Sequence, residues 1–401
     1  MVARTVSTHE REAVVVLAGV VQIAASIATA LLMRRLASRL YGARAGSIAL
    51  VAGLFFPDAI VYSVRLWPDT LFSLFTAGAL VVLARHLARP SWRTAAWFGA
   101  LAGIATLFKT VGVVLVPALL VATGWRSLLR RRTWIALVAY SLTLAPWVAR
   151  NAIVHGAPML GNELAFTFFW IQPNGRLKEV REAWLRLPDH RARQAAGSRA
   201  LHEIFSQYPS RFFAPVGGRA ALMFGWESFI SKFGSGGRRF FPRLGALGNR
   251  LLVVILQIGF LALYPLALIG LFFLRDPPIK RALCGFLVLY ALPCIFLGAH
   301  TRYRLPWLPA LATFAAGAWT QRAEIVGGLR RPWRVAGFAL AALAIAGNCY
   351  RHPPWAPGEA PPLSSVAVAE RFELALLVGR NARCAAAGGR CTGRVDDAHQ
   401  E

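Results

Sequence analysis

Apolar stretches of about 15–25 residues alternate with short basic clusters along most of the chain, a pattern typical of membrane-spanning helices. The stretches lie near residues 13–33, 46–63, 70–84, 95–108, 110–124, 134–149, 250–274, 282–299, 305–320 and 335–350. Several are short, but a short helix can cross when its neighbours bury its ends, and residues 95–124 are also compatible with a re-entrant hairpin. The pattern predicts an all-α polytopic membrane protein with about ten transmembrane helices.

The basic clusters set the expected orientation. They lie at residues 34–44, 85–93, 126–132, 275–281 and 322–334, and the short junctions between them carry only Arg65, Lys109, Arg302 and Arg304. Because cytoplasmic loops are enriched in Lys and Arg, the clusters mark the cytoplasmic side and both termini are expected outside. Nearly all the cations are Arg, which we interpret as the codon bias of a GC-rich bacterium. We therefore expect a multi-pass protein of the bacterial inner membrane, with the weakly charged junctions on the periplasmic side.

Composition narrows the classes of partner. The 401 residues are 56% hydrophobic and 16% charged, and the formal net charge is +27. A charge of this size can indicate nucleic-acid binding, but here the cations are placed between apolar stretches as the positive-inside rule requires. The lipid bilayer is therefore the expected partner, and nucleic acid is not.

The same pattern divides the chain into four regions. We expect N-terminal transmembrane helices with an acidic outer loop, a periplasmic loop, C-terminal transmembrane helices and a poorly ordered periplasmic tail, at residues 1–149, 150–249, 250–350 and 351–401. In the tail, Cys384 and Cys391 could form a disulfide if the tail is periplasmic.

The periplasmic loop contains an amphipathic pattern. Its apolar residues recur at about 3.6-residue spacing beside basic ones; they are Leu201, Ile204, Phe205, Tyr208 and Phe212. This spacing predicts a helix that lies in the headgroup region, or equally an ordinary helix of a globular loop.

Two acidic side chains stand at the outer ends of early spans. Asp58 and Asp69 flank a short outer loop, and Asp69 follows Pro68 at the start of an apolar stretch. An ionisable group near hydrocarbon costs roughly 2.5–3.5 kcal/mol on insertion scales, which suggests that such a group has a use. The alternative for Asp69 is local, because Pro68 predicts a helix start and a carboxylate in a first turn is stabilised by the helix dipole.

Cationic side chains occupy the other outer junctions. Lys109 stands alone between two apolar runs, where it either snorkels to the headgroups or meets an anion. Arg150 follows the span that ends near residue 149. Further along, Arg302, Tyr303 and Arg304 stand directly before a span, and in an extended loop the two arginines would project to one side, where both could bind a phosphate.

Together these residues predict one outer-leaflet site that combines a carboxylate with lysine and arginine. Glycosyl transfer from a lipid phosphate needs these groups: a base for the proton of the acceptor hydroxyl, and cations for the departing phosphate. The predicted catalytic residue is Asp69, and the predicted substrate-binding residues are Lys109, Arg302, Arg304, Tyr303, Arg150 and Asp58. No cofactor follows from the sequence; a divalent metal stays open, with Asp69 as its ligand, since no ligand cluster requires one.

Five stretches occur in an order that resembles a known family. They are RRLASRLYGARAGSIALVAGLFFPDAIVYS with WPDTLFSLF, LFKTVGVVLVP, LTLAPWVARNAIVHGAPML with FFWIQPNG, HEIFSQYPSRFF and RYRLPWLPALA. Over about residues 13–320 the chain thereby resembles the polyprenyl-phosphate-sugar-dependent glycosyltransferases of the GT-C fold, which include protein O-mannosyltransferases and the lipid A aminoarabinose transferase.

The resemblance implies roles for individual residues. Asp69 matches the acidic residue of the second outer loop, which is implicated in acceptor activation or metal coordination. Lys109 matches a basic position assigned to the lipid phosphate, and Arg302 and Arg304 match a basic pair before a late span, where a phosphate role is implied. Arg150 matches a recurrent position with a loop-shaping role, whereas Asp58 matches no acid of the family.

The function implied by the resemblance is transfer of a sugar, with inversion, from a polyprenyl-phosphate donor to a lipid, glycan or protein acceptor. One departure matters: the first outer loop of the family carries an acidic pair, and this chain is expected to begin just before the second span, where Glu10 and Glu12 do not form that motif. The alternatives are a truncated or inactive member that acts as a non-catalytic membrane protein, and a transporter or lipid flippase, a class that also uses intramembrane charges and broken helices.

Overall fold

Helices make up the secondary structure of the described part of the chain. The computed structural model describes residues 8–64, 67–156, 158–161, 186–187, 190–207, 216–217, 219–220, 223–224, 245–275, 277–297 and 301–351, and no strand occurs among them. The prediction of an all-α protein is thereby confirmed for these residues. Cys384 and Cys391 lie outside them, as does the C-terminal part of the amphipathic pattern at Tyr208 and Phe212.

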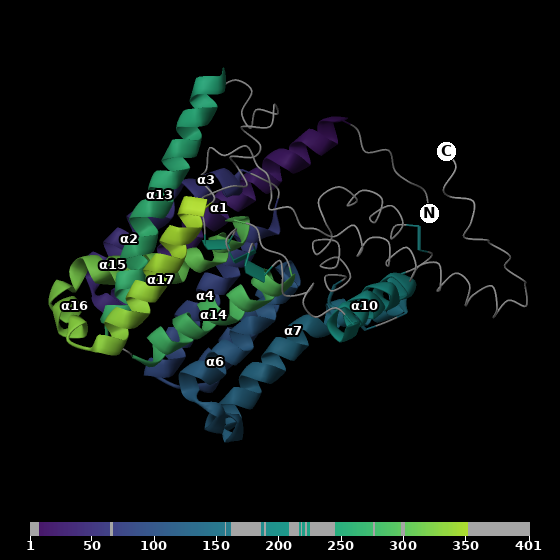
Figure 1. Ribbon diagram of the computed structural model, residues 1–401. Coiled ribbons are helices and arrows are strands. Elements are labelled where there is room, and N and C mark those ends of the chain that lie inside the picture. Colours follow the sequence, from purple (N-terminus) through teal and green to yellow (C-terminus); the bar gives the residue numbers. More distant parts are fainter. Residues whose placement is uncertain are drawn as a thin grey trace, which may run out of the picture.

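The helices follow the predicted apolar stretches (Figure 1). In the N-terminal part they are α1 (Thr8–Tyr41), α2 (Ala43–Phe55), α3 (Pro57–Ser63), α4 (Pro68–Ala88), α5 (Trp92–Phe108), η1 (Thr110–Val114), α6 (Leu115–Thr123), η2 (Trp125–Leu129) and α7 (Arg131–His155). The remaining elements are α10 (His190–Gln207), α13 (Gly245–Phe273), α14 (Pro278–Leu297), η4 (Thr301–Trp307), α15 (Leu308–Thr320), α16 (Arg322–Leu329) and α17 (Pro332–Arg351).

Several helices have the length and hydropathy needed to cross a bilayer. Four described helices pass this test, within α1, α4, α7 and α14. The pair α2 and α3 would be a fifth, bent by 49° at Phe56, which precedes a proline and is extended. Shorter apolar helices cover Thr110–Thr123, Gly259–Phe273 and Pro332–Gly347. These helices indicate a multi-pass membrane protein, and the count of about ten spans stays a prediction.

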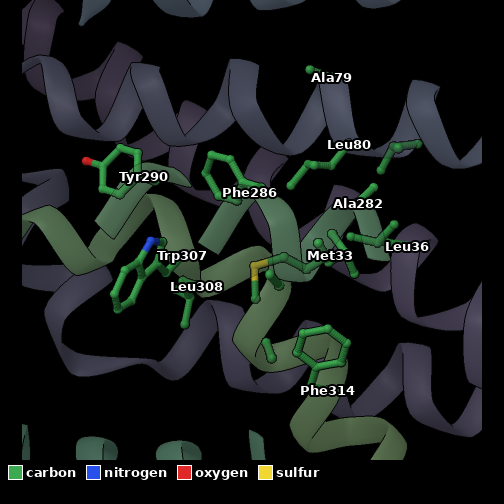
Figure 2. Packing of buried hydrophobic residues seen from close by; sticks show 14 of the residues in the cluster. Met33, Leu36, Ala79, Leu80, Ala282, Phe286, Tyr290, Trp307, Leu308 and Phe314 are labelled. Atoms are coloured by element: carbon green, nitrogen blue, oxygen red, sulfur yellow. The ribbon is translucent and has the colours of Figure 1, made fainter. Parts of the chain in front are cut away.

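The core lies where α1, α4, α14 and α15 meet. Figure 2 shows Met33 and Leu36 of α1 close to Leu80 of α4, Phe286 of α14 and Phe314 of α15, all of them buried. On the outside of the bundle large apolar side chains are exposed, as a lipid-facing surface requires; examples are Val16, Leu142 and Leu340. The bundle is therefore apolar on both its inner and its outer surface.

Glycines allow a close contact between α5 and α7. Gly99 and Gly103, one turn apart on α5, face α7, and a Cβ added at Gly99 would lie 2.0 Å from the backbone oxygen of Ala136. A pair of small residues four apart lets two membrane helices approach until their backbones touch. This contact holds α7 against α5, and through α5 it braces the segment that carries Lys109.

The arginine-rich junctions and the junctions with few charges lie at opposite ends of the bundle. At the arginine-rich end, Gln321 after α15 donates from Nε2 to the Tyr41 oxygen at the end of α1, 3.1 Å away, and Arg39 donates to the Val81 oxygen of α4. At the other end, α3, the start of α4 and η4 contact one another. This separation agrees with the predicted orientation, and which side of the membrane each end faces stays a prediction.

The contact between α5 and α7 predicts the effect of a small substitution. Gly99→Ala should lower the melting temperature of the detergent-solubilised protein, because overpacking against a backbone costs roughly 1–3 kcal/mol. Gly19→Ala in α1 is the matched control, since a Cβ there meets nothing within 4 Å. Alanine is the better helix former, so the control should leave the melting temperature unchanged or raise it. Equal melting temperatures for the two variants would contradict the packing.

Candidate active site

Asp69 lies in the first turn of α4 and faces inward. Proline at position 68 occupies the first turn of that helix, and Trp67 before it is extended, so the sequence-predicted helix start is confirmed. The Asp69 side chain is only 2% exposed. No side chain caps the helix at Trp67, and the Asp69 carboxylate interacts with a residue outside α4. Asp69 thus lies at the positive end of the helix dipole and also has a partner outside α4.

Lys109 is the partner of Asp69. Its Nζ lies 2.6 Å from Oδ1 of Asp69, and its side chain is 15% exposed. Lys109 is the residue at which α5 ends; its backbone is extended, and η1 begins directly after it. The chain can turn back here because Gly112 approaches the backbone of Thr106 more closely than a Cβ would allow. Of the two sequence-based alternatives for Lys109, the structure has the one in which it meets an anion.

Aromatic rings surround the Lys109 ammonium. Its Nζ lies 3.8 Å from the centroid of the Tyr303 ring in η4 and 6.0 Å from that of Phe72, one turn after Asp69. A cation over an aromatic face gains about 0.5–2 kcal/mol, with the larger values where water is excluded. Tyr303 therefore helps to fix the position of Lys109, and the predicted neighbourhood of Asp69, Lys109 and Tyr303 is real.

A second buried pair stands beside the first. Nη2 of Arg304 in η4 lies 3.9 Å from Oδ2 of Asp58 in the first turn of α3, and the Arg304 side chain is only 4% exposed. The guanidinium carbon of Arg304 also lies 5.0 Å from the ring centroid of Phe260 and 5.7 Å from that of Tyr264, both in α13. Asp58, which matched no acid of the family, is thus an intramolecular partner of a predicted phosphate-binding arginine.

The backbone before α15 differs from the sequence-based expectation. Residues 301–307 form the 3₁₀-helix η4 and not an extended loop. The extended loop on which the shared direction of Arg302 and Arg304 was predicted is therefore absent at these described backbone positions. Pro306 lies within this helix, and Trp307 at its end is buried. The side chain of Arg302 lies outside the described part of the structure.

Arg150 is not part of this cluster. It lies exposed near the end of α7, donates from Nη1 to the side chain of Asn151, 3.0 Å away, and stacks 5.1 Å from the centroid of the Trp147 ring. Asn151 in turn donates to the backbone oxygen of Met159, 2.8 Å away. Among the described residues these interactions hold the chain after α7, in line with a loop-shaping role.

Two aromatic residues complete the site and were not singled out from the sequence. Tyr290 of α14 stacks on Phe72 with centroids 5.9 Å apart, and it interacts electrostatically with Asp69. Trp307 of η4 lies with its ring centroid 6.3 Å from that of Tyr290. Both are almost fully buried. The string RYRLPW contained Trp307, but nothing in its spacing separates a site residue from a membrane-interface anchor.

A small open pocket adjoins the first turn of α4. It lies between α1, α4 and η4, and hydroxyl groups of Ser26, Thr29, Thr70 and Ser73 line it together with apolar side chains. The hydroxyls of Thr29 and Ser73 donate to carbonyls of their own helices. The described residues bring no three His, Cys, Asp or Glu side chains together as a metal site.

Comparison with known proteins finds a family match over part of the chain. Residues 9–149, which include Asp58, Asp69 and Lys109, match the family model described as dolichyl-phosphate-mannose-protein mannosyltransferase. No curated protein and no solved structure matches the chain. The match supports the GT-C superfamily and points to a membrane-embedded glycosyltransferase in general.

Proposed function

We propose that the protein transfers a sugar from a polyprenyl-phosphate donor to an acceptor hydroxyl at the periplasmic face of the bacterial inner membrane. The observation that carries this proposal is the buried pair of Asp69 and Lys109, at the end of the bundle opposite to the arginine-rich junctions. A base for the acceptor and a cation for a phosphate are the two groups that such a transfer needs. The acceptor is a lipid, a glycan or a protein.

The reaction is a single displacement. The acceptor oxygen attacks the anomeric carbon of the sugar, and the bond between that carbon and the phosphate oxygen of the donor breaks. The polyprenyl phosphate leaves with the bonding electrons, while the acceptor proton passes to Asp69. Attack opposite to the leaving group inverts the anomeric carbon. If a divalent metal takes part, Asp69 is its ligand and activates the acceptor through it.

The cations of the site hold the donor phosphate. Lys109 reaches its position from a flexible stem and is confined by the Tyr303 ring, so a small movement carries its ammonium from the Asp69 carboxylate toward a phosphate. Arg304 supplies a guanidinium beside it, and Arg302 is the remaining candidate of the same segment. A donor that draws Lys109 away would leave Asp69 free to accept a proton, which couples donor binding to activation of the base.

A non-catalytic membrane protein and a transporter or flippase are the competing functions. Either could keep the pair of Asp69 and Lys109 for structural reasons, because a buried charge needs a partner. Neither requires the carboxylate to exchange a proton with an acceptor. An assay of transfer therefore separates these functions from the proposed one.

Replacing the proposed base tests the function. In membranes that contain a labelled pool of polyprenyl-phosphate sugar, Asp69→Asn should lower transfer by at least about 100-fold, the usual contribution of a general base. The matched control is Glu324→Gln, which changes a carboxylate of the arginine-rich end that pairs with Arg275; it should keep transfer near the wild-type level. Unchanged turnover in Asp69→Asn would remove this residue from the mechanism.

The same substitution leaves Lys109 without its counter-ion, which can destabilise the fold. The double variant Asp69→Asn with Lys109→Gln removes both charges and should recover the melting temperature without recovering transfer. Recovery of both would show that the carboxylate has a structural role only.

Replacing the proposed phosphate ligand gives a different kinetic signature. Lys109→Gln should raise KM for the donor about 10-fold or more, since a hydrogen bond to a charged group contributes roughly 1.5–3 kcal/mol. Lys280→Gln is the control, because Lys280 is also a buried lysine but bonds the Leu274 oxygen at the other end of the bundle. A KM for the donor that changes equally in both variants would argue against phosphate binding by Lys109.

A further inference from the structure

Arg219 is a buried cation beside the outer end of α14. It lies in the sequence RAALMF of the segment between α10 and α13 and is only 6% exposed. Its Nη1 donates to the backbone oxygen of Phe296 in the last turn of α14. Its Nη2 is buried without a hydrogen-bond partner, and no carboxylate pairs with it, among the residues that the structure describes. The guanidinium is thus only partly satisfied.

Capping of a helix explains part of this arrangement. Cations near a helix C-terminus bond its last carbonyls and offset the helix dipole. Lys280 and Arg334 do this for α13, donating to the backbone oxygens of Phe273 and Leu274. The bond from Arg219 to Phe296 is of the same kind. Capping does not explain the unpartnered Nη2 of Arg219. A buried donor without an acceptor costs about 1–3 kcal/mol of stability, and more when the donor is charged.

A second buried donor lies in η4. The indole Nε1 of Trp307 has no partner among the described residues, and Figure 2 shows it on the side of the ring that faces Tyr290. Phe224, five residues after Arg219, packs on Trp307 with ring centroids 5.5 Å apart. Phe224 therefore packs on η4, from which Tyr303 and Arg304 reach the pairs described above.

Two buried hydrogen-bond donors without a partner, one of them positively charged, favour the binding of an anion with several acceptor oxygens. We propose that Arg219 binds the phosphate of the lipid-linked donor, with the indole N–H of Trp307 as a second hydrogen-bond donor to it. This inference rests on the proposed function and adds to it residues that the sequence did not single out. A guanidinium suits the task because its planar fork matches the geometry of a phosphate.

The charge of Arg219 fits this role. Burial lowers its pKa to about 10, so the side chain stays protonated at neutral pH. Lys109 and Arg304 already neutralise Asp69 and Asp58, whereas no described carboxylate neutralises Arg219. A phosphate that enters the site would therefore find an uncompensated positive charge there.

Binding of a lipid phosphate tests the inference without the transfer reaction. The full chain in lipid nanodiscs is titrated with polyprenyl phosphate and, separately, with the uncharged polyprenol of the same length. The wild type should bind the phosphate more tightly than the alcohol. Arg219→Gln should lower the affinity for the phosphate about 10-fold or more and leave that for polyprenol unchanged, whereas Arg219→Lys should retain part of it. Arg334→Gln, which removes a capping arginine of α13, is the matched control and should not alter the affinity.

Trp307→Phe is the second variant. It keeps the ring that packs on Phe224 and leaves the cap of α14 in place, so it remains informative even if Arg219→Gln fails to fold. It should weaken phosphate binding about threefold to tenfold, as loss of one hydrogen bond predicts.

The outcomes separate the inference from the function on which it rests. If Trp307→Phe and either Arg219 variant bind polyprenyl phosphate as tightly as the wild type, Arg219 is only a helix cap and the inference is wrong, while transfer through Asp69 can still hold. If the wild type binds phosphate and alcohol equally, the inference and the proposed function both fail.

Discussion

The ion pair between Asp69 and Lys109 is the constraint on which the functional end of the bundle depends. A carboxylate and an ammonium that are removed from water each lose several kcal/mol of hydration, and they can stay ionised there only by facing each other. The two residues are 40 positions apart; Asp69 lies in the first turn of α4, and Lys109 directly follows α5. The start of α4 and the break after α5 must therefore lie side by side, and neither can shift along its helix axis without separating the charges.

A proline directly before each acidic residue of the site determines where that residue lies along the bundle. Asp58 follows Pro57 at the start of α3, and Asp69 follows Pro68 at the start of α4. A proline suits the first turn of a helix because its missing N–H would have no partner there, and the carboxylate that follows lies at the positive end of the helix dipole. The same device thus positions both carboxylates at one end of the bundle. The helix dipoles offset part of the free energy that the two carboxylates lose on leaving water, and the positive charges of Lys109 and Arg304 offset the remainder.

The features that depend on the local sequence pattern were predicted from the sequence. The apolar stretches became helices, the helix start at Pro68 was correct, and Asp69, Lys109 and Tyr303 came together as expected. Pairing partners depend on tertiary contacts that spacing does not encode, so the pair of Asp58 and Arg304 was not foreseen. The 3₁₀-helix η4 was missed for a related reason: RYRLPW reads as an extended segment before a proline until Trp307 is packed between Tyr290 and Phe224.

Charge balance connects the resting site with the proposed chemistry. Two cations balance the two carboxylates of the resting site, and among the described residues Arg219 adds a positive charge without a carboxylate partner. A lipid-phosphate sugar is a phosphodiester and brings one negative charge, which a cation without a carboxylate partner, such as Arg219, would offset. During transfer the phosphate gains negative charge as it leaves, while the proposed base loses its own by taking the acceptor proton. The total charge of the buried site then stays constant along the reaction, so the low dielectric that makes each charge costly opposes no step of the transfer.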